Sequence, residues 1–200
     1  MKHSSLIPAA LAILAITSGA SSAAVIYSGP QNVSVTNSFT SVYIDVDALV
    51  AQSSETPGWD VDVFFGGEAF GNSPSFQPVR QTIANNSAIV RLYFGDVVDS
   101  TDIYASTAAG STTHIGGSAD QFASGADGYL GFRLIDNSSV GPYYGWMKVN
   151  FSNTGDMGTI IEWAYDNTGS GISVGAIPEP ATYSLLGIAT VAWVLRRRRS

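Results

Sequence analysis

The chain has 200 residues and no cysteine, which excludes disulfide bonds, zinc–thiolate sites and a cysteine nucleophile. Its 16 acidic and nine basic residues give a net charge of −7. Five basic residues lie near the two ends, so residues 25–176 carry 15 acidic and four basic side chains and a net charge of −11. This stretch is long enough for one domain with a sizeable core. Its charge disfavours binding to nucleic acid or anionic lipid and favours binding to cations, including Ca²⁺.

The first 24 residues have the three parts of a secretory signal peptide. Lys2 supplies a positive charge, and Leu6–Ile16 is an apolar stretch. Ser18–Ala24 is small and polar and contains two overlapping cleavage motifs. The apolar stretch is short for a membrane span. We therefore expect residues 1–24 to be a signal peptide and residues 25–176 to be the exported domain.

The exported domain is expected to consist of short strands separated by turns. Apolar and polar residues alternate with period two in several segments, and most of these segments are followed directly by Gly or Asp. Long apolar stripes with a helical period are missing from the sequence. The predicted strands cover residues 42–47, 59–65, 88–94, 129–135, 143–151 and 159–165.

Turn spacing and strand length together predict the fold class. The two aspartate-bearing segments, 42–47 and 59–65, are expected to pair across the connection 48–58. Residues 105–127 are rich in Ala, Gly, Ser and Thr and predict a long loop or an irregular stretch. Many short strands with closely spaced turns are typical of sandwiches and jelly rolls. The prediction is an all-β fold, an antiparallel β-sandwich or jelly roll, flanked by a signal peptide and a C-terminal transmembrane helix.

His114 is the only histidine of the exported domain, so a serine hydrolase triad would have to use it. Ser111 and Ser118 are near it in sequence, but the members of a triad are neighbours in space, so nearness in sequence is weak evidence. A histidine in a loop rich in serine and glycine is typically solvated. We therefore predict no catalytic residues and no enzyme activity.

Two aspartate pairs have a spacing that glycoside hydrolysis could use. Asp45 and Asp47 are two residues apart, as are Asp60 and Asp62, so each pair would share a strand face. Glycosidases need two carboxyl groups about 5 to 9.5 Å apart across a cleft. The simpler interpretation is that Val and Ile point inward and the aspartates point into solvent.

Calcium is the metal that this composition favours, because it prefers carboxylate, carbonyl and water oxygens. The candidate ligands Asp96, Asp99 and Asp102 lie close together after a predicted strand. They do not match an EF-hand loop, and aspartate is also common in turns because it bonds to its own backbone. Further oxygen-bearing turn residues are Asn153, Asp156, Asp166 and Asn167.

Five aromatic residues in or near predicted strands could form a platform for stacking sugar rings. The alternative is that most of them pack in the core against a facing sheet. These residues are Trp59, Tyr143, Tyr144, Trp146 and Trp163.

The last 24 residues combine three elements in a fixed order. Pro178-Glu179-Pro180 is followed by the uncharged segment Ala181–Leu195 and then by Arg196, Arg197, Arg198 and Arg199. As a helix, residues 181–195 would span roughly 22 Å, which is short of the hydrocarbon core of about 30 Å. Interfacial arginines and local thinning can absorb the difference. The arginines are expected to act as a membrane stop on the cytoplasmic side, with the body on the other side.

This order of elements resembles the PEP-CTERM sorting signal of bacterial exosortase substrates. Three body segments, 128–133, 144–149 and 159–165, look like the C-terminal part of uncharacterised members of that group. The resemblance implies that an exosortase in the inner membrane recognises Pro178, Glu179, Pro180 and Ala181 and cleaves nearby. It also implies an association with exopolysaccharide and biofilm systems in bacteria with an outer membrane.

We therefore expect an exported structural or adhesive protein of the cell surface or extracellular matrix. Its precursor would be anchored in the inner membrane, and its partners would be exosortase and extracellular polysaccharide, without nucleic acid. The alternative is a carbohydrate-binding protein or carbohydrate-active enzyme on a β-sandwich scaffold. No cofactor is expected, with Ca²⁺ as the one candidate.

Overall fold

The computed structural model describes residues 25–105, 109–111, 114–135 and 142–178. The expected signal peptide, residues 1–24, and the expected transmembrane segment, residues 181–195, lie outside these residues. The described chain is all-β, and its paired strands are antiparallel. No helix in this part of the chain has the length and hydropathy that crossing a membrane requires.

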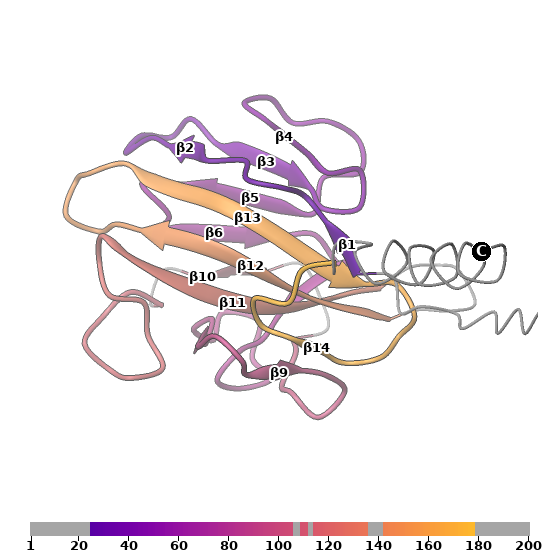
Figure 1. Ribbon diagram of the computed structural model, residues 1–200. Coiled ribbons are helices and arrows are strands. Elements are labelled where there is room, and N and C mark those ends of the chain that lie inside the picture. Colours follow the sequence, from indigo (N-terminus) through magenta and orange to yellow (C-terminus); the bar gives the residue numbers. More distant parts are fainter. Residues whose placement is uncertain (1–24, 106–108, 112–113, 136–141, 179–200) are drawn as a thin grey trace, which may run out of the picture.

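Seven strands form a large sheet with the order β1-β13-β12-β11-β7, in which β2 also pairs with β13 and β8 with β11 (Figure 1). Its strands are β1 (Val25–Tyr27), β2 (Val33–Val35), β7 (Phe76–Pro78), β8 (Arg91–Leu92), β11 (Ala126–Leu134), β12 (Tyr143–Phe151) and β13 (Gly158–Asp166). Strands β11, β12 and β13 are nine residues long, and they confirm the three strands predicted near the C-terminal end of the body.

Five strands form a smaller sheet with the order β10-β6-β5-β3-β4. Its strands are β3 (Val42–Asp45), β4 (Val50–Gln52), β5 (Val61–Phe64), β6 (Ala69–Asn72) and β10 (Ala109–Ser111). Strands β3 and β5 pair as expected, with Ile44 opposite Val61, although β4 lies in the connection between them. Val and Ile point inward in both strands, because their burial alternates along each strand.

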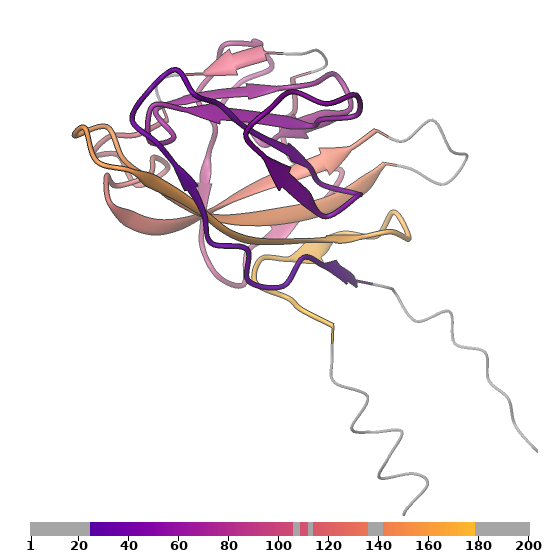
Figure 2. The same ribbon diagram turned by 90° about the horizontal axis from the view of Figure 1, so that it is seen from above.

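The two sheets lie one above the other (Figure 2), and their facing sides contribute to one hydrophobic cluster. The smaller sheet supplies Ile44, Val63 and Phe70, and the large sheet supplies Phe132 and Trp163, all at most 1% exposed. The Trp163 indole N–H donates a hydrogen bond to the carbonyl oxygen of Val46 at 3.1 Å. Apolar contact and this bond therefore hold the same two layers together.

The other face of the large sheet is covered too. A two-stranded ribbon of β9 (Val97–Val98) and β14 (Ile172–Ser173) lies there, and Val98 and Ile172 pack in a second cluster with Tyr144 and Trp146. Strand β12 is buried at most of its positions as a result. A strand covered on both faces loses the simple alternation of inward and outward residues.

Two sequence predictions about the middle of the chain are correct only in part. The strand expected over residues 88–94 is reduced to β8, with an isolated bridge from Ile89 to Arg80. Residues 105–127, expected to be a long loop or irregular stretch, contain β10 and the start of β11. Short polar and small residues gave no periodic signal there, so tertiary pairing decided the structure.

A glycine where the two layers meet provides a test of the packing. Gly67 has φ +98°, and a Cβ atom built there would lie 2.1 Å from Cδ1 of the buried Phe151. Gly67→Ala should lower the free energy of unfolding by about 2–5 kcal/mol, because it adds overpacking to backbone strain. Urea unfolding measures the loss.

Gly95→Ala is the matched control, since Gly95 has φ +90° with nothing within 4 Å of the added Cβ. It should cost only about 1–2 kcal/mol from the backbone. Equal losses in the two variants would contradict this packing.

Candidate functional site

The C-terminal segment of the body is held by hydrogen bonds as far as Ala176. The Val174 amide donates to the Asp96 carbonyl at 2.7 Å, and the Trp146 indole N–H donates to the Ala176 carbonyl at 3.1 Å. Ile177 and Pro178, which follow, are exposed. The sorting segment predicted from the sequence thus begins where the chain leaves the body. Its remaining residues, Glu179, Pro180, Ala181 and Arg196–Arg199, lie outside the described residues.

Three aspartates come together at one end of the smaller sheet. Asp45 ends β3, Asp47 follows in the next turn, and Asp60 immediately precedes β5. Because Ile44 pairs with Val61, the antiparallel register brings Asp45 beside Asp60. One oxygen from each carboxylate lies within 4.8 Å of the other two.

These carboxylates line a pocket of about 370 Å³, which we call the acidic pocket. The large sheet contributes Leu134 and Tyr143 to its wall, and Gly58, Ser75 and Ile135 complete it. The pocket therefore lies where the two sheets meet.

Backbone and side-chain donors fix the buried member of the group. Asp60 is 4% exposed, its Oδ2 accepts from the Val46 amide at 2.9 Å, and its Oδ1 accepts from the Ser75 hydroxyl at 3.0 Å. Asp45 accepts from the Ala48 amide at 2.9 Å. The expectation that these aspartates all point into solvent is wrong for Asp60. It lies just before the start of β5, where alternation does not set the direction of a side chain.

Mutual proximity shifts the proton affinity of the group. A hydrogen bond with Asp45, then burial, then repulsion from Asp45 and Asp60 raise the pKa of Asp47 to about 6. Burial also raises the pKa of Asp60, against the hydrogen bonds from Val46 and Ser75. The one ion pair found in the described part of the chain joins Lys148 to Asp127 at 3.2 Å. A bound proton or a cation would therefore relieve the repulsion in the acidic pocket.

The arrangement is better suited to an ion than to glycoside cleavage. Three carboxylates can supply part of the six to eight oxygens that Ca²⁺ takes, with water completing the shell. A glycosidase needs room for a sugar between its two carboxyl groups, about 5 to 9.5 Å apart. One oxygen from each of Asp45, Asp47 and Asp60 lies within 4.8 Å of the other two, which is closer than that role requires.

The sequence-based calcium candidates lie elsewhere and cap local turns. Asp96 accepts from the Tyr93 amide, Asp99 from the Thr101 amide and Asp102 from the Asp99 amide, at 2.7–3.0 Å. Among the described residues they do not form a group with mutually close ligand atoms; Asp45, Asp47 and Asp60 do. The predicted pairing of segments 42–47 and 59–65 could have identified this group, since it brings the ends of both aspartate-bearing strands together.

His114 is buried, so the prediction of a solvated loop histidine is wrong. It is 0% exposed, its ring lies 5.3–6.4 Å from those of Phe70, Phe122 and Phe151, and its Nε2 lies 2.7 Å from the Gly67 carbonyl oxygen. Burial lowers the pKa of His114 to about 4. A neutral histidine enclosed by phenylalanines serves packing.

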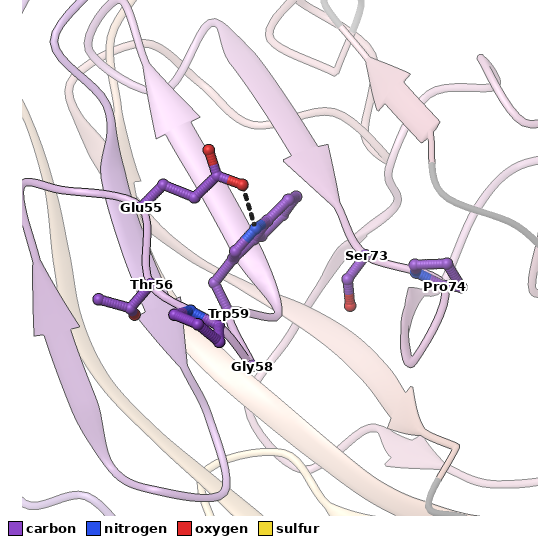
Figure 3. A pocket seen from close by; sticks show the side chains of 7 residues that line it. Glu55, Thr56, Gly58, Trp59, Ser73 and Pro74 are labelled. Carbon is purple, nitrogen blue, oxygen red and sulfur yellow. Dashed lines mark hydrogen bonds between the residues drawn. The ribbon is translucent and has the colours of Figure 1, made fainter.

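A second pocket, which we call the tryptophan pocket, meets the acidic pocket at Gly58 and has a volume of about 460 Å³. Trp59 is half-buried there, and its indole N–H donates to Glu55 at 3.2 Å. Ser73 and Pro74 lie across from it (Figure 3). The ring of Tyr43 packs edge-to-face at 5.7 Å and helps to fix the indole.

Hydrogen bonds also connect the two pockets. The Ser73 and Ser75 hydroxyls are 2.7 Å apart, and Ser75 donates to Asp60. Of the five aromatic residues considered for sugar stacking, Tyr144, Trp146 and Trp163 are in the core, as the simpler interpretation predicts. Trp59 and Tyr143 remain partly accessible, one in each pocket.

The raised pKa of Asp47 predicts a pH-dependent stability. A carboxyl whose folded pKa is about 6 rather than 3.8 makes folding more favourable as the pH falls through that window, and this gain is lost as the pH rises. Asp47→Asn, which cannot ionise, should be more stable than the wild type at about pH 7 and lose this advantage at about pH 4. Chemical unfolding at both pH values measures the difference.

His114 acts in the opposite direction, because its lowered pKa costs stability as the pH falls below 6.5. The wild type and the Asp47→Asn variant share this contribution, so it cancels in the comparison. An Asp47→Asn effect that is the same at both pH values would contradict the shifted pKa.

The C-terminal residues have a known counterpart. Residues 176–199 match the family model described as the PEP-CTERM protein-sorting motif. No curated protein and no solved structure matches the chain significantly. The motif indicates an exported protein with a membrane-anchored precursor, and it implies exosortase as the processing partner. The chain thus carries a PEP-CTERM protein-sorting motif that begins at Ala176, the last body residue held by Trp146.

Proposed function

We propose that the protein is a non-catalytic structural or adhesive component of the cell surface or extracellular matrix. The sorting motif at residues 176–199 carries this proposal. Its support from the body is the charge of −11 over residues 25–176, which favours cation-mediated contacts with other matrix polymers. In this proposal the two facing sheets act as one β-sandwich that carries the two pockets on its edge.

Processing would occur at the segment that follows Ala176. Pro178 and Pro180 restrict the backbone and favour an extended chain, which is the form that protease sites usually bind. The arginines would keep the apolar run from passing through the membrane. The inner membrane of a bacterium with an outer membrane would be the site of this step.

Mass spectrometry of the mature protein from its native host tests the processing step. Peptides from Trp193–Ser200 should be missing. Glu179→Ala should leave the tail attached and the protein in the inner membrane, whereas replacing the four arginines with serine should let some chain escape uncleaved. Retention of residues 196–200 in wild-type protein from a host with an intact exosortase would show that the tail is a plain anchor.

The acidic pocket is the proposed Ca²⁺ site of the exported domain. Millimolar Ca²⁺ should raise the melting temperature by binding only the folded state. Asp45→Asn with Asp47→Asn should remove this shift, whereas Asp99→Asn with Asp102→Asn should leave it intact. Mg²⁺ at equal ionic strength is the control for general screening. A shift that is equal with both ions, or that survives Asp45→Asn/Asp47→Asn, would rule out this site.

Carbohydrate binding is the second candidate, and the tryptophan pocket favours it. A fixed, partly accessible indole beside Glu55, Thr56 and Ser73 offers an apolar face with polar neighbours, the combination found in small-molecule sites. Trp59→Ala should abolish retention of the protein on the host's exopolysaccharide, because stacking on the indole is lost. Phe39→Ala, which truncates an aromatic side chain that is 85% exposed, should not. Equal retention of both variants would exclude this pocket.

A further inference from the structure

Exposed apolar side chains surround the place where the chain leaves the body. Phe94 is 76% exposed, Val97 55% and Ile177 51%. We call these three residues the exit patch. A monomeric soluble protein exposes single apolar side chains routinely, but a group of them beside a functional segment commonly marks a contact surface.

Backbone pairing fixes these residues beside the C-terminal segment. Val97 in β9 pairs with Ser173 in β14, and the Gly95 amide donates to the Val174 carbonyl at 3.0 Å. Phe94 lies over Gly175, where an added Cβ would be 2.5 Å from its ring. The apolar groups are therefore held in place by the segment that leads into the sorting motif.

The length of the connecting chain limits what can face this patch. Three residue steps separate Pro178 from Ala181, the start of the uncharged segment. Even fully extended, they span at most about 11 Å. In a membrane-anchored precursor, which the sorting motif implies, Pro178 must lie within that reach of the start of the uncharged segment, and this brings the side of the body that carries the exit patch toward the bilayer.

The position of the patch on the fold agrees with this constraint. The ribbon of β9 and β14 lies on the side of the large sheet that faces away from the smaller sheet, and the chain leaves the body on that side (Figure 2). Val25 and Tyr27, at the start of the body, pack against the same cluster as Val174 and Ala176. Both ends of the described chain therefore emerge on one side.

We propose that the exit patch lies in the interfacial layer of the membrane while the precursor is anchored. Phe94 and Val97 enter the boundary between headgroups and acyl chains, and this removes their apolar surface from water. Asp96 lies between them, and the body carries strong negative charge. The favoured surface is therefore zwitterionic lipid, because anionic headgroups would repel it.

The proposal rests on the anchored precursor but adds a specific orientation to it. A body docked through the exit patch holds Ile177 and Pro178 at the membrane surface. A processing enzyme embedded in the membrane would then find the sorting segment at a fixed depth. Without docking, the body would reorient freely and the position of the segment would vary.

The chain has no cysteine, so single-cysteine labelling can test the orientation. Full-length protein inserted into phosphatidylcholine vesicles would carry an environment-sensitive fluorophore at Val97→Cys or Phe94→Cys. Lipids with a quencher near the headgroups should remove most of the emission at both positions. Phe39→Cys and Ile83→Cys are the controls, since those side chains are 85% and 80% exposed elsewhere on the body, and they should keep their emission.

Phe94→Ser in the Val97→Cys background should weaken the quenching, and so should added phosphatidylglycerol. Inserted protein with equal emission at positions 97, 39 and 83 would overturn the proposal, because the body would then stand clear of the bilayer. Shielding of position 97 in detergent, together with a dimer mass, would overturn it in favour of self-association. Normal export and tail removal in the host with no quenching would refute only the docking, whereas a retained tail would refute the processing step.

Discussion

The hydrogen bond from the Trp163 indole to the Val46 carbonyl is the contact on which the rest of the arrangement depends. It joins the large sheet to the smaller one inside the shared core. Val46 is itself 0% exposed, and its amide donates to the buried Asp60. Both peptide groups of Val46 are thus fixed, and so are the directions of Asp45 and Asp47 on either side of it. The packing of the two layers thereby produces a concentrated negative charge at their edge.

A protein with this body charge must limit the repulsion between its acidic groups, and several of them, such as Asp96, Asp99 and Asp102, cap turns by accepting hydrogen bonds from nearby backbone amides. The acidic pocket is the exception, because three carboxylates meet there without a cationic side chain among the described residues that pairs with them. Repulsion of this kind is unfavourable for stability at neutral pH. A cation bound between the three carboxylates, as proposed for Ca²⁺, would remove this repulsion.

The sequence contained most of the fold but little of the site. Period-two patterning located β11, β12 and β13 because long half-buried strands repeat their pattern several times. It overestimated the strand at residues 88–94 and missed β10, where two or three residues pair only because a neighbouring strand is present. Asp60 and His114 were placed in solvent by local rules, whereas long-range packing buries both. The close spacing of Asp96, Asp99 and Asp102 suggested a calcium site, but these residues are spaced in this way because they cap turns.

The account requires that packing around Val46 forces Asp47 against Asp45 and Asp60. The direct measurement is the titration of the aspartate carboxyl carbons by NMR, in the wild type and in Trp163→Phe, which lacks the indole N–H. Asp47 should titrate near pH 6 in the wild type and closer to the ordinary aspartate value in the variant. An Asp47 that titrates at the ordinary value in the wild-type protein would show that the three carboxylates are not held together, and would contradict the account.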